Sequence, residues 1–114
     1  MSFIRLNPKQ DPIVIDKSQL GGGLSLTSIQ TSTYNAKVND YVQGDPSGGS
    51  FNVNLPSTAV INDVVAVANI TGSVNSINVI PAGGQTLATP DGTLAVPAFT
   101  SYTLTFNGTT WIVA

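Results

Sequence analysis

Residues 101–113 read SYTLTFNGTTWIV, and this stretch decides the fold. Large apolar side chains alternate with polar ones on both sides of Asn107-Gly108, which is the pattern of two half-buried strands joined by a tight turn. Because Asn and Gly both tolerate positive φ, we expect them to be the central residues of a type I′ turn. The cross-strand pairs predicted from this turn are Phe106 with Thr109, Leu104 with Trp111, and Tyr102 with Val113. This register gathers the large apolar groups on one face.

Shorter versions of the same pattern recur along the chain. The run 64–68 is continuously apolar, which predicts a strand buried on both faces. Turn residues and prolines separate the segments, and one short helical turn is possible near 57–61. The other expected strands lie near 24–27, 29–36, 38–42, 51–55, 77–80, 87 and 94–96. About eight or nine short strands at this spacing predict an all-β fold, an antiparallel sandwich or barrel.

Several of these residues are candidates for the core or for packing between copies of the chain. They are the large apolar side chains on the predicted inward faces: Phe51, Leu55, Val65, Val67, Leu104, Phe106 and Trp111. Hydrophobic residues make up 41% of the 114 residues, enough to form the core of one domain.

Charge is scarce in this chain. Charged residues are 9% of the total, far below the roughly 25% of a typical soluble domain. Charged side chains usually protect strand edges from pairing with other chains. We therefore expect other subunits to cover edges and faces, as in an obligate oligomer.

The first 23 residues differ from the rest. Two prolines, Pro8 and Pro12, precede the short apolar stretch 13–15, and residues 21–23 are all Gly, a flexible joint. We interpret 1–23 as an extended arm that adds a strand to a partner, and 24–114 as the β domain. An edge strand of the same domain is the alternative. The candidate docking residues of the arm are Arg5, Leu6, Ile13, Val14 and Ile15.

The residue inventory argues against catalysis and metal binding. The chain has no His, no Cys and no Glu, so hydroxyl nucleophiles lack their usual base and thiolate zinc sites are excluded. Most of its Asp residues stand beside Pro, Gly or Asn, where Asp commonly bonds to the backbone of a turn. No Asp-x-Asp-x-Asp-Gly calcium loop occurs. We therefore expect no enzyme activity, no metal and no cofactor.

Charge and hydropathy also narrow the partners and the location. A net charge of −2 without a basic stripe argues against nucleic acid. No apolar run has the length that a membrane span needs, and the first residues contain no signal-peptide region. These observations predict synthesis in a cytosol without export. Carbohydrate stays open as a ligand, because Trp111, Tyr102, Tyr34 and Tyr41 supply aromatic rings, although Trp111 is expected in the core.

Residues 40–114 resemble a module of tailed-bacteriophage virion proteins. The resemblance is carried by Asp40-Tyr41-Val42, by 51–57 with its Leu-Pro-Ser, by 62–69, by 77–86 with its Pro-x-Gly-Gly, and by the Asn-Gly-Thr-x-Trp of 102–113. Modules of this kind occur in fibre, head-fibre and capsid decoration proteins, and they typically assemble as trimers. The usual module often has Gly near position 63, where this chain has Asp63.

The resemblance implies a structural protein located in the virion. Because nearly the whole chain is module plus a short arm, it favours a capsid decoration (cement) protein or head-fibre protein whose arm docks on the major capsid protein. One alternative is a tail-fibre or baseplate module that binds host glycans through loops such as 44–50 and 82–92. Another is a free-standing bacterial carbohydrate-binding protein or an enzyme accessory domain.

Overall fold

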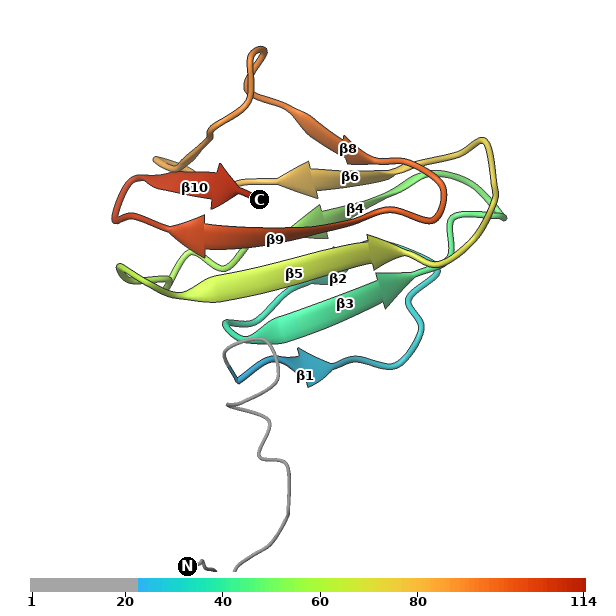
Figure 1. Cartoon of the computed structure of the whole chain (residues 1–114), viewed down its shortest axis with the longest axis horizontal. Helices are drawn as coiled ribbons and strands as arrows, with labels where there is room; N and C mark the ends of the chain where they lie inside the picture. The colour runs from blue at the N-terminus through green and yellow to red at the C-terminus, as the bar shows by residue number, and fades with distance from the viewer. Residues whose placement is uncertain (1–22) are drawn as a thin grey trace, which may run out of the picture.

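The computed structural model describes residues 23–114, which form ten strands and no helix (Figure 1). Six strands make a large sheet, in the order β1 (Ser25–Leu26), β3 (Asp40–Gly44), β5 (Val64–Asn69), β9 (Ser101–Phe106), β10 (Thr110–Val113) and β7 (Thr86–Leu87). Four make a small sheet, in the order β2 (Tyr34–Asn35), β4 (Phe51–Asn54), β6 (Ile77–Ile80) and β8 (Leu94–Val96). The all-β prediction is confirmed, with ten strands in place of eight or nine.

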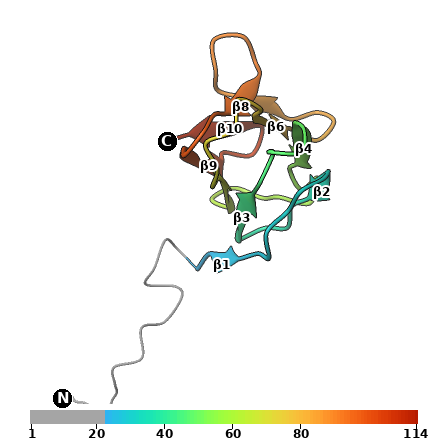
Figure 2. The same cartoon turned by 90° about the vertical axis from the view of Figure 1, so that its right-hand side faces the viewer.

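The chain alternates between the two sheets from β1 to β9. Each strand is followed by one in the opposite sheet, so the two sheets face each other across a shared interior (Figure 2). Parallel neighbours require a crossover connection, and in the first part of this chain each crossover runs through the opposite sheet. Accordingly β1, β3 and β5 are parallel, as are β2, β4 and β6. The pairs β5–β9, β9–β10 and β6–β8 are antiparallel, so both sheets are mixed and the predicted antiparallel arrangement is only partly confirmed.

The segment from β3 to β4 shows how this crossing is built. It has the composition of a hairpin turn, yet it carries the chain from one sheet to the other. Asp45 Oδ1 accepts a hydrogen bond from the Ser47 amide at 2.9 Å, which turns the backbone. Gly44 lies where the sheets approach each other, and a Cβ there would collide with Ile77 and lie 3.0 Å from Phe51 Cζ. Any larger residue at this point of the crossing would force the Ile77 side chain to shift.

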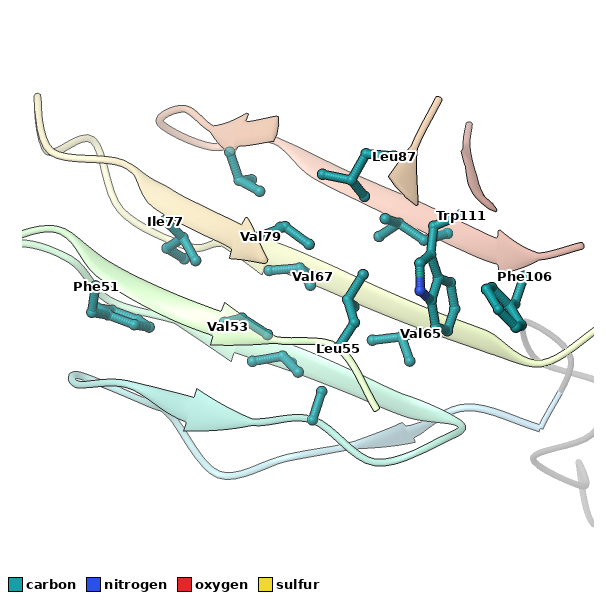
Figure 3. Packing of buried hydrophobic residues seen from close by; sticks show 14 residues of the cluster. Phe51, Val53, Leu55, Val65, Val67, Ile77, Val79, Leu87, Phe106 and Trp111 are labelled. Atoms are coloured by element: carbon teal, nitrogen blue, oxygen red, sulfur yellow. The ribbon is translucent and has the colours of Figure 1, made fainter. Parts of the chain in front are cut away.

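The core between the sheets is one cluster with residues from both (Figure 3). The predicted core residues are all buried in it, including Phe51 and Leu55 beside the small sheet and Val65, Val67, Leu104, Phe106 and Trp111 in the large one. Trp111 is fully buried, and its ring centroid lies 4.9 Å from that of Phe106. Buried and more exposed residues alternate strictly along β4, β6 and β9, so the buried ones lie on the inward face of each strand.

The terminal hairpin forms, but its register differs from the prediction by two residues. Trp111 pairs with Phe106, and Val113 pairs with Leu104. Gly108, with φ of 103°, and Thr109 are the central residues, the arrangement of a type II′ turn. Asn107 precedes them, and its Oδ1 accepts the amides of Thr109 and Thr110 at 3.0 and 2.7 Å. A shift of two keeps every side chain on its face, so the predicted apolar face is still correct.

Other strand predictions have mixed outcomes. Strand β5 is buried on both faces as predicted, with Ala66 on its outer side only 2% exposed. The expected strand over 29–36 reduces to β2 and an isolated bridge at Gln30, because the Thr and Ser side chains there do not alternate with apolar ones. The possible helical turn near 57–61 is absent; this stretch forms turns.

Asn69 joins the two sheets from inside. It is 2% exposed at the end of β5, and its Nδ2 donates to the carbonyl of Val96 in β8 at 3.1 Å. Its Oδ1 accepts the amide and the hydroxyl of Thr71, both at 3.1 Å. One buried side chain thus satisfies three polar groups of two residues, Thr71 and Val96.

We expect Asn69→Leu to lower the free energy of unfolding by about 2–3 kcal/mol, because it leaves buried polar groups without partners. The same substitution at Asn52, which is exposed on the small sheet, is the matched control and should change stability by about 0.5 kcal/mol or less. Urea unfolding measures both. Equal losses in the two variants would contradict the role given to Asn69.

Candidate functional site

The carboxylates that the structure describes serve the backbone. Besides Asp45, Asp91 Oδ1 accepts the Thr93 amide at 3.1 Å and Asp63 Oδ2 accepts the Val60 amide at 2.8 Å. Hydrogen bonds to Ser47 and to Thr93 lower the pKa of Asp45 and of Asp91, respectively. Within 23–114 no three acidic residues gather in a way that would hold a metal ion. The turn role predicted for these Asp residues is confirmed.

Asp40 makes more side-chain hydrogen bonds than the other carboxylates of residues 23–114. Its Oδ2 accepts the Tyr34 hydroxyl and the Lys37 amide, both at 2.8 Å, and so ties the start of β3 to β2 in the other sheet. Burial, followed by the hydrogen bond to Asp40, raises the pKa of Tyr34 from 10.0 to about 12. The tyrosine is therefore a neutral donor across the ordinary pH range, and this contact is structural.

The aromatic residues do not form a common platform. Tyr34 and Tyr102 pack against the core cluster, and Trp111 lies inside it. Tyr41 points outward from the large sheet, since Val42 beside it is buried. Tyr41 instead shares a hollow of about 250 Å³ with Phe99, a residue that the sequence analysis did not single out. The sequence does contain a signal for Phe99, because it is an aromatic residue that stands after Pro97 in a connection and belongs to no alternating strand pattern.

Two larger hollows flank β2 and β4 of the small sheet. One, of about 620 Å³, lies beyond the ends of these strands and is lined by 35–38 and 54–58. The other, of about 590 Å³, lies before their starts and is lined by 31–33 and 48–52. Both volumes fall within the range of small-molecule sites. The hollow before the strand starts is lined mostly by hydroxyl, amide and backbone groups, whereas the one beyond the strand ends is lined mostly by apolar atoms, including those of Val38, Leu55 and Pro56. Lys37 is the one charged residue among the two linings.

Between these hollows the outer face of the small sheet carries paired amides. Asn54 Nδ2 donates to Asn35 Oδ1 at 2.8 Å, and Asn78 Nδ2 donates to Asn52 Oδ1 at 3.4 Å. Parallel, in-register strands bring these side chains together. Each pair keeps donors and acceptors free toward solvent.

The outer face of the large sheet, called here the neutral face, has a different composition. Alternation from the buried residues assigns to it Leu26, Tyr41, Gln43, Val64, Ala66, Ala68, Thr86, Ser101, Thr103, Thr105, Thr110 and Ile112. The set contains no charged residue. Leu26 is 64% exposed at one border of the face and Ile112 is 44% exposed toward the other.

The strand edges are short. The four outermost strands, β1 and β7 of the large sheet and β2 and β8 of the small one, have two or three residues each. Very short edge strands by themselves limit pairing with other chains. If other subunits cover part of this weakly charged chain, they are therefore expected to cover the sheet faces more than the strand edges.

The predicted docking residues Arg5, Leu6, Ile13, Val14 and Ile15 lie outside the described residues, as does the arm that contains them. The described part of the chain has no helix of the length and apolarity that a membrane span requires. No protein-family model matches the chain, and no curated protein matches it either.

The raised pKa of Tyr34 gives a pH prediction. Because its pKa is higher in the folded than in the unfolded chain, the stability that it contributes is complete below pH 10 and is lost as the pH rises toward about 12. We expect Tyr34→Phe to remove the part of the decrease in the free energy of unfolding at alkaline pH that comes from ionisation of this tyrosine. Urea unfolding of both proteins between pH 9 and about 12 measures it. Parallel stability curves over that interval would contradict the assignment.

Proposed function

We propose that the chain is a structural protein of a tailed-bacteriophage virion that binds the capsid exterior as a decoration (cement) or head-fibre protein. The observation that carries the proposal is that the three motifs of the resemblance meet at one side chain, Gln85. Its Nε2 donates to the carbonyl of Pro56, the proline of Leu-Pro-Ser, at 3.0 Å. Its Oε1 accepts the Trp111 indole N–H at 2.9 Å and the Ala82 amide at 3.0 Å.

This convergence supports the resemblance for a physical reason. Pro56, Ala82 and Trp111 are far apart in sequence, yet one amide satisfies a group in each. Motifs that depend on one another in this way are expected to occur together and in order.

The proposed mechanism is passive stabilisation. A protein that binds only the assembled shell stabilises that shell by mass action. Residues 1–20 would provide the contact, with Ile13, Val14 and Ile15 as an added strand on the major capsid protein. Three arms in a trimer would raise avidity without tight single contacts. The location of β1, the first described strand, at an edge of the large sheet is compatible with an arm that leads away from the body.

Deletion of residues 1–20 tests this function. The full chain and the truncated chain are each mixed with capsids of the phage that encodes them, and co-sedimentation measures the bound fraction. We expect the truncated chain to keep its fold by circular dichroism and to lose at least tenfold in apparent affinity. Unchanged binding of the truncated chain would overturn the arm assignment, and no capsid binding by the full chain would overturn the function.

A glycan-binding module of a tail fibre or baseplate is the second candidate. The two hollows flanking β2 and β4 favour it, because their volumes suit small ligands, and the polar lining of one and the mixed apolar and amide lining of the other suit the two faces of a neutral sugar. The free amide groups of Asn35, Asn52, Asn54 and Asn78 lie between the two hollows.

A glycan array tests the second candidate directly. If it is right, the wild-type chain gives saturable binding to neutral glycans, and Asn54→Ala lowers the signal at least fivefold. Ala95→Ser, a substitution at an exposed position of β8 in the same sheet, is the control and should leave the signal unchanged. A silent array for the wild-type chain would rule the candidate out.

A further inference from the structure

Phe99 is exposed but held in place. It is 77% exposed, although large aromatic side chains are usually buried. Its φ of 52° lies in the left-handed region, which is costly for a bulky residue. Its amide donates to the Thr71 carbonyl at 3.1 Å, and its ring lies over Gly72, where an added Cβ would be 3.0 Å from Phe99 Cε2. A ring fixed in this way loses little freedom when it meets a partner.

The hollow next to Phe99 opens on the neutral face. Tyr41 and Phe99 line it together with Ala68 and Ser101, which are paired neighbours on the outer side of β5 and β9. Its volume of about 250 Å³ is below the roughly 300–1,000 Å³ of typical small-molecule sites. An apolar side chain of another protein surface suits this size better than a free ligand does.

The chemistry of the neutral face points to a second copy of the chain as its occupant. Two uncharged faces approach each other without repulsion and without stripping water from charged groups. The face carries both protruding apolar groups, such as Leu26 and Ile112, and a hollow that can receive one. A surface with both features can match the same surface of a second copy, with the protruding groups of one copy meeting the hollow of the next, in a two-fold pair or around a closed ring.

The size of the face is adequate for association. The 25 strand residues of the large sheet cover roughly 400 Å² in projection. The connections at Phe99 and Ile70 extend the apolar surface at one end. Two copies would then bury on the order of 1,000 Å², which is the lower range of specific interfaces.

We propose that copies of this chain associate through the neutral face, with the fixed ring of Phe99 and the hollow beside Tyr41 as its centre of contact. The inference rests on the proposed function in one respect, since the count of three copies comes from the resemblance. It deepens that function by assigning the surface on which the oligomer is built.

Light scattering after size exclusion, with the full chain and without capsids, tests the surface. At chain concentrations of tens of micromolar, we expect the wild-type mass to be two or more times the 11.8 kDa of one chain. Thr103→Lys places a charge at an exposed position of the neutral face and should reduce the mass to that of one chain. Asn52→Lys places the same charge at an exposed position of the small sheet and should leave the oligomer intact.

Phe99→Asn separates an interface role from a structural one. Asn tolerates positive φ, so the folded chain should unfold at an unchanged or higher urea concentration while the oligomer dissociates at least tenfold more readily. A monomeric wild-type chain, an oligomer that survives Thr103→Lys, or equal dissociation by Asn52→Lys would overturn the proposal. Because capsids are absent, none of these results depends on whether the chain binds a virion.

Discussion

The structure depends on one constraint: the chain crosses from one sheet to the other after nearly every strand, so the core must be assembled from the inward-facing side chains of many short strands in both sheets. The six strands β1 to β6 wind around a common interior, and the parallel pairs follow from that path. Crossing points need special residues, which explains Gly44 against Ile77 and the inward amide of Asn69. Gln85 closes the interior by binding the indole of Trp111.

In this arrangement a partner would contact the outer faces of the sheets and not the strand edges. A chain with so few charges would be at risk if its sheets had long free edges, but the outermost strands have only two or three residues. The two outer faces differ in chemistry. Amide pairs occupy the small sheet, whereas the large sheet has small and hydroxyl side chains bordered by Leu26, Ile112 and Phe99. The scarcity of charged residues matters most for the outer face of the large sheet, which has none and is therefore suited to contact with another subunit.

Alternation was sufficient to predict most strands and the core. Phe51, Leu55 and Trp111 were assigned to the interior from the sequence because period-two patterns determine which face a side chain occupies. Alternation could not predict which strands pair with each other or in which register. The turn at 44–50 has the composition of a hairpin but joins two sheets, and Asn107 uses its side chain in place of a positive φ. Phe99 escaped prediction because its exposure follows from the backbone of a connection, which no periodicity describes.

The proposed function and the proposed interface together describe a passive brace: neutral faces join copies of the chain, and arms attach the joined unit to a shell. Electron cryomicroscopy of phage particles that carry the protein tests this account most directly. The account predicts density for several copies on the capsid exterior, with their large sheets facing one another and Phe99 at the contact. Single copies with the neutral face in solvent, or density confined to the tail, would contradict it.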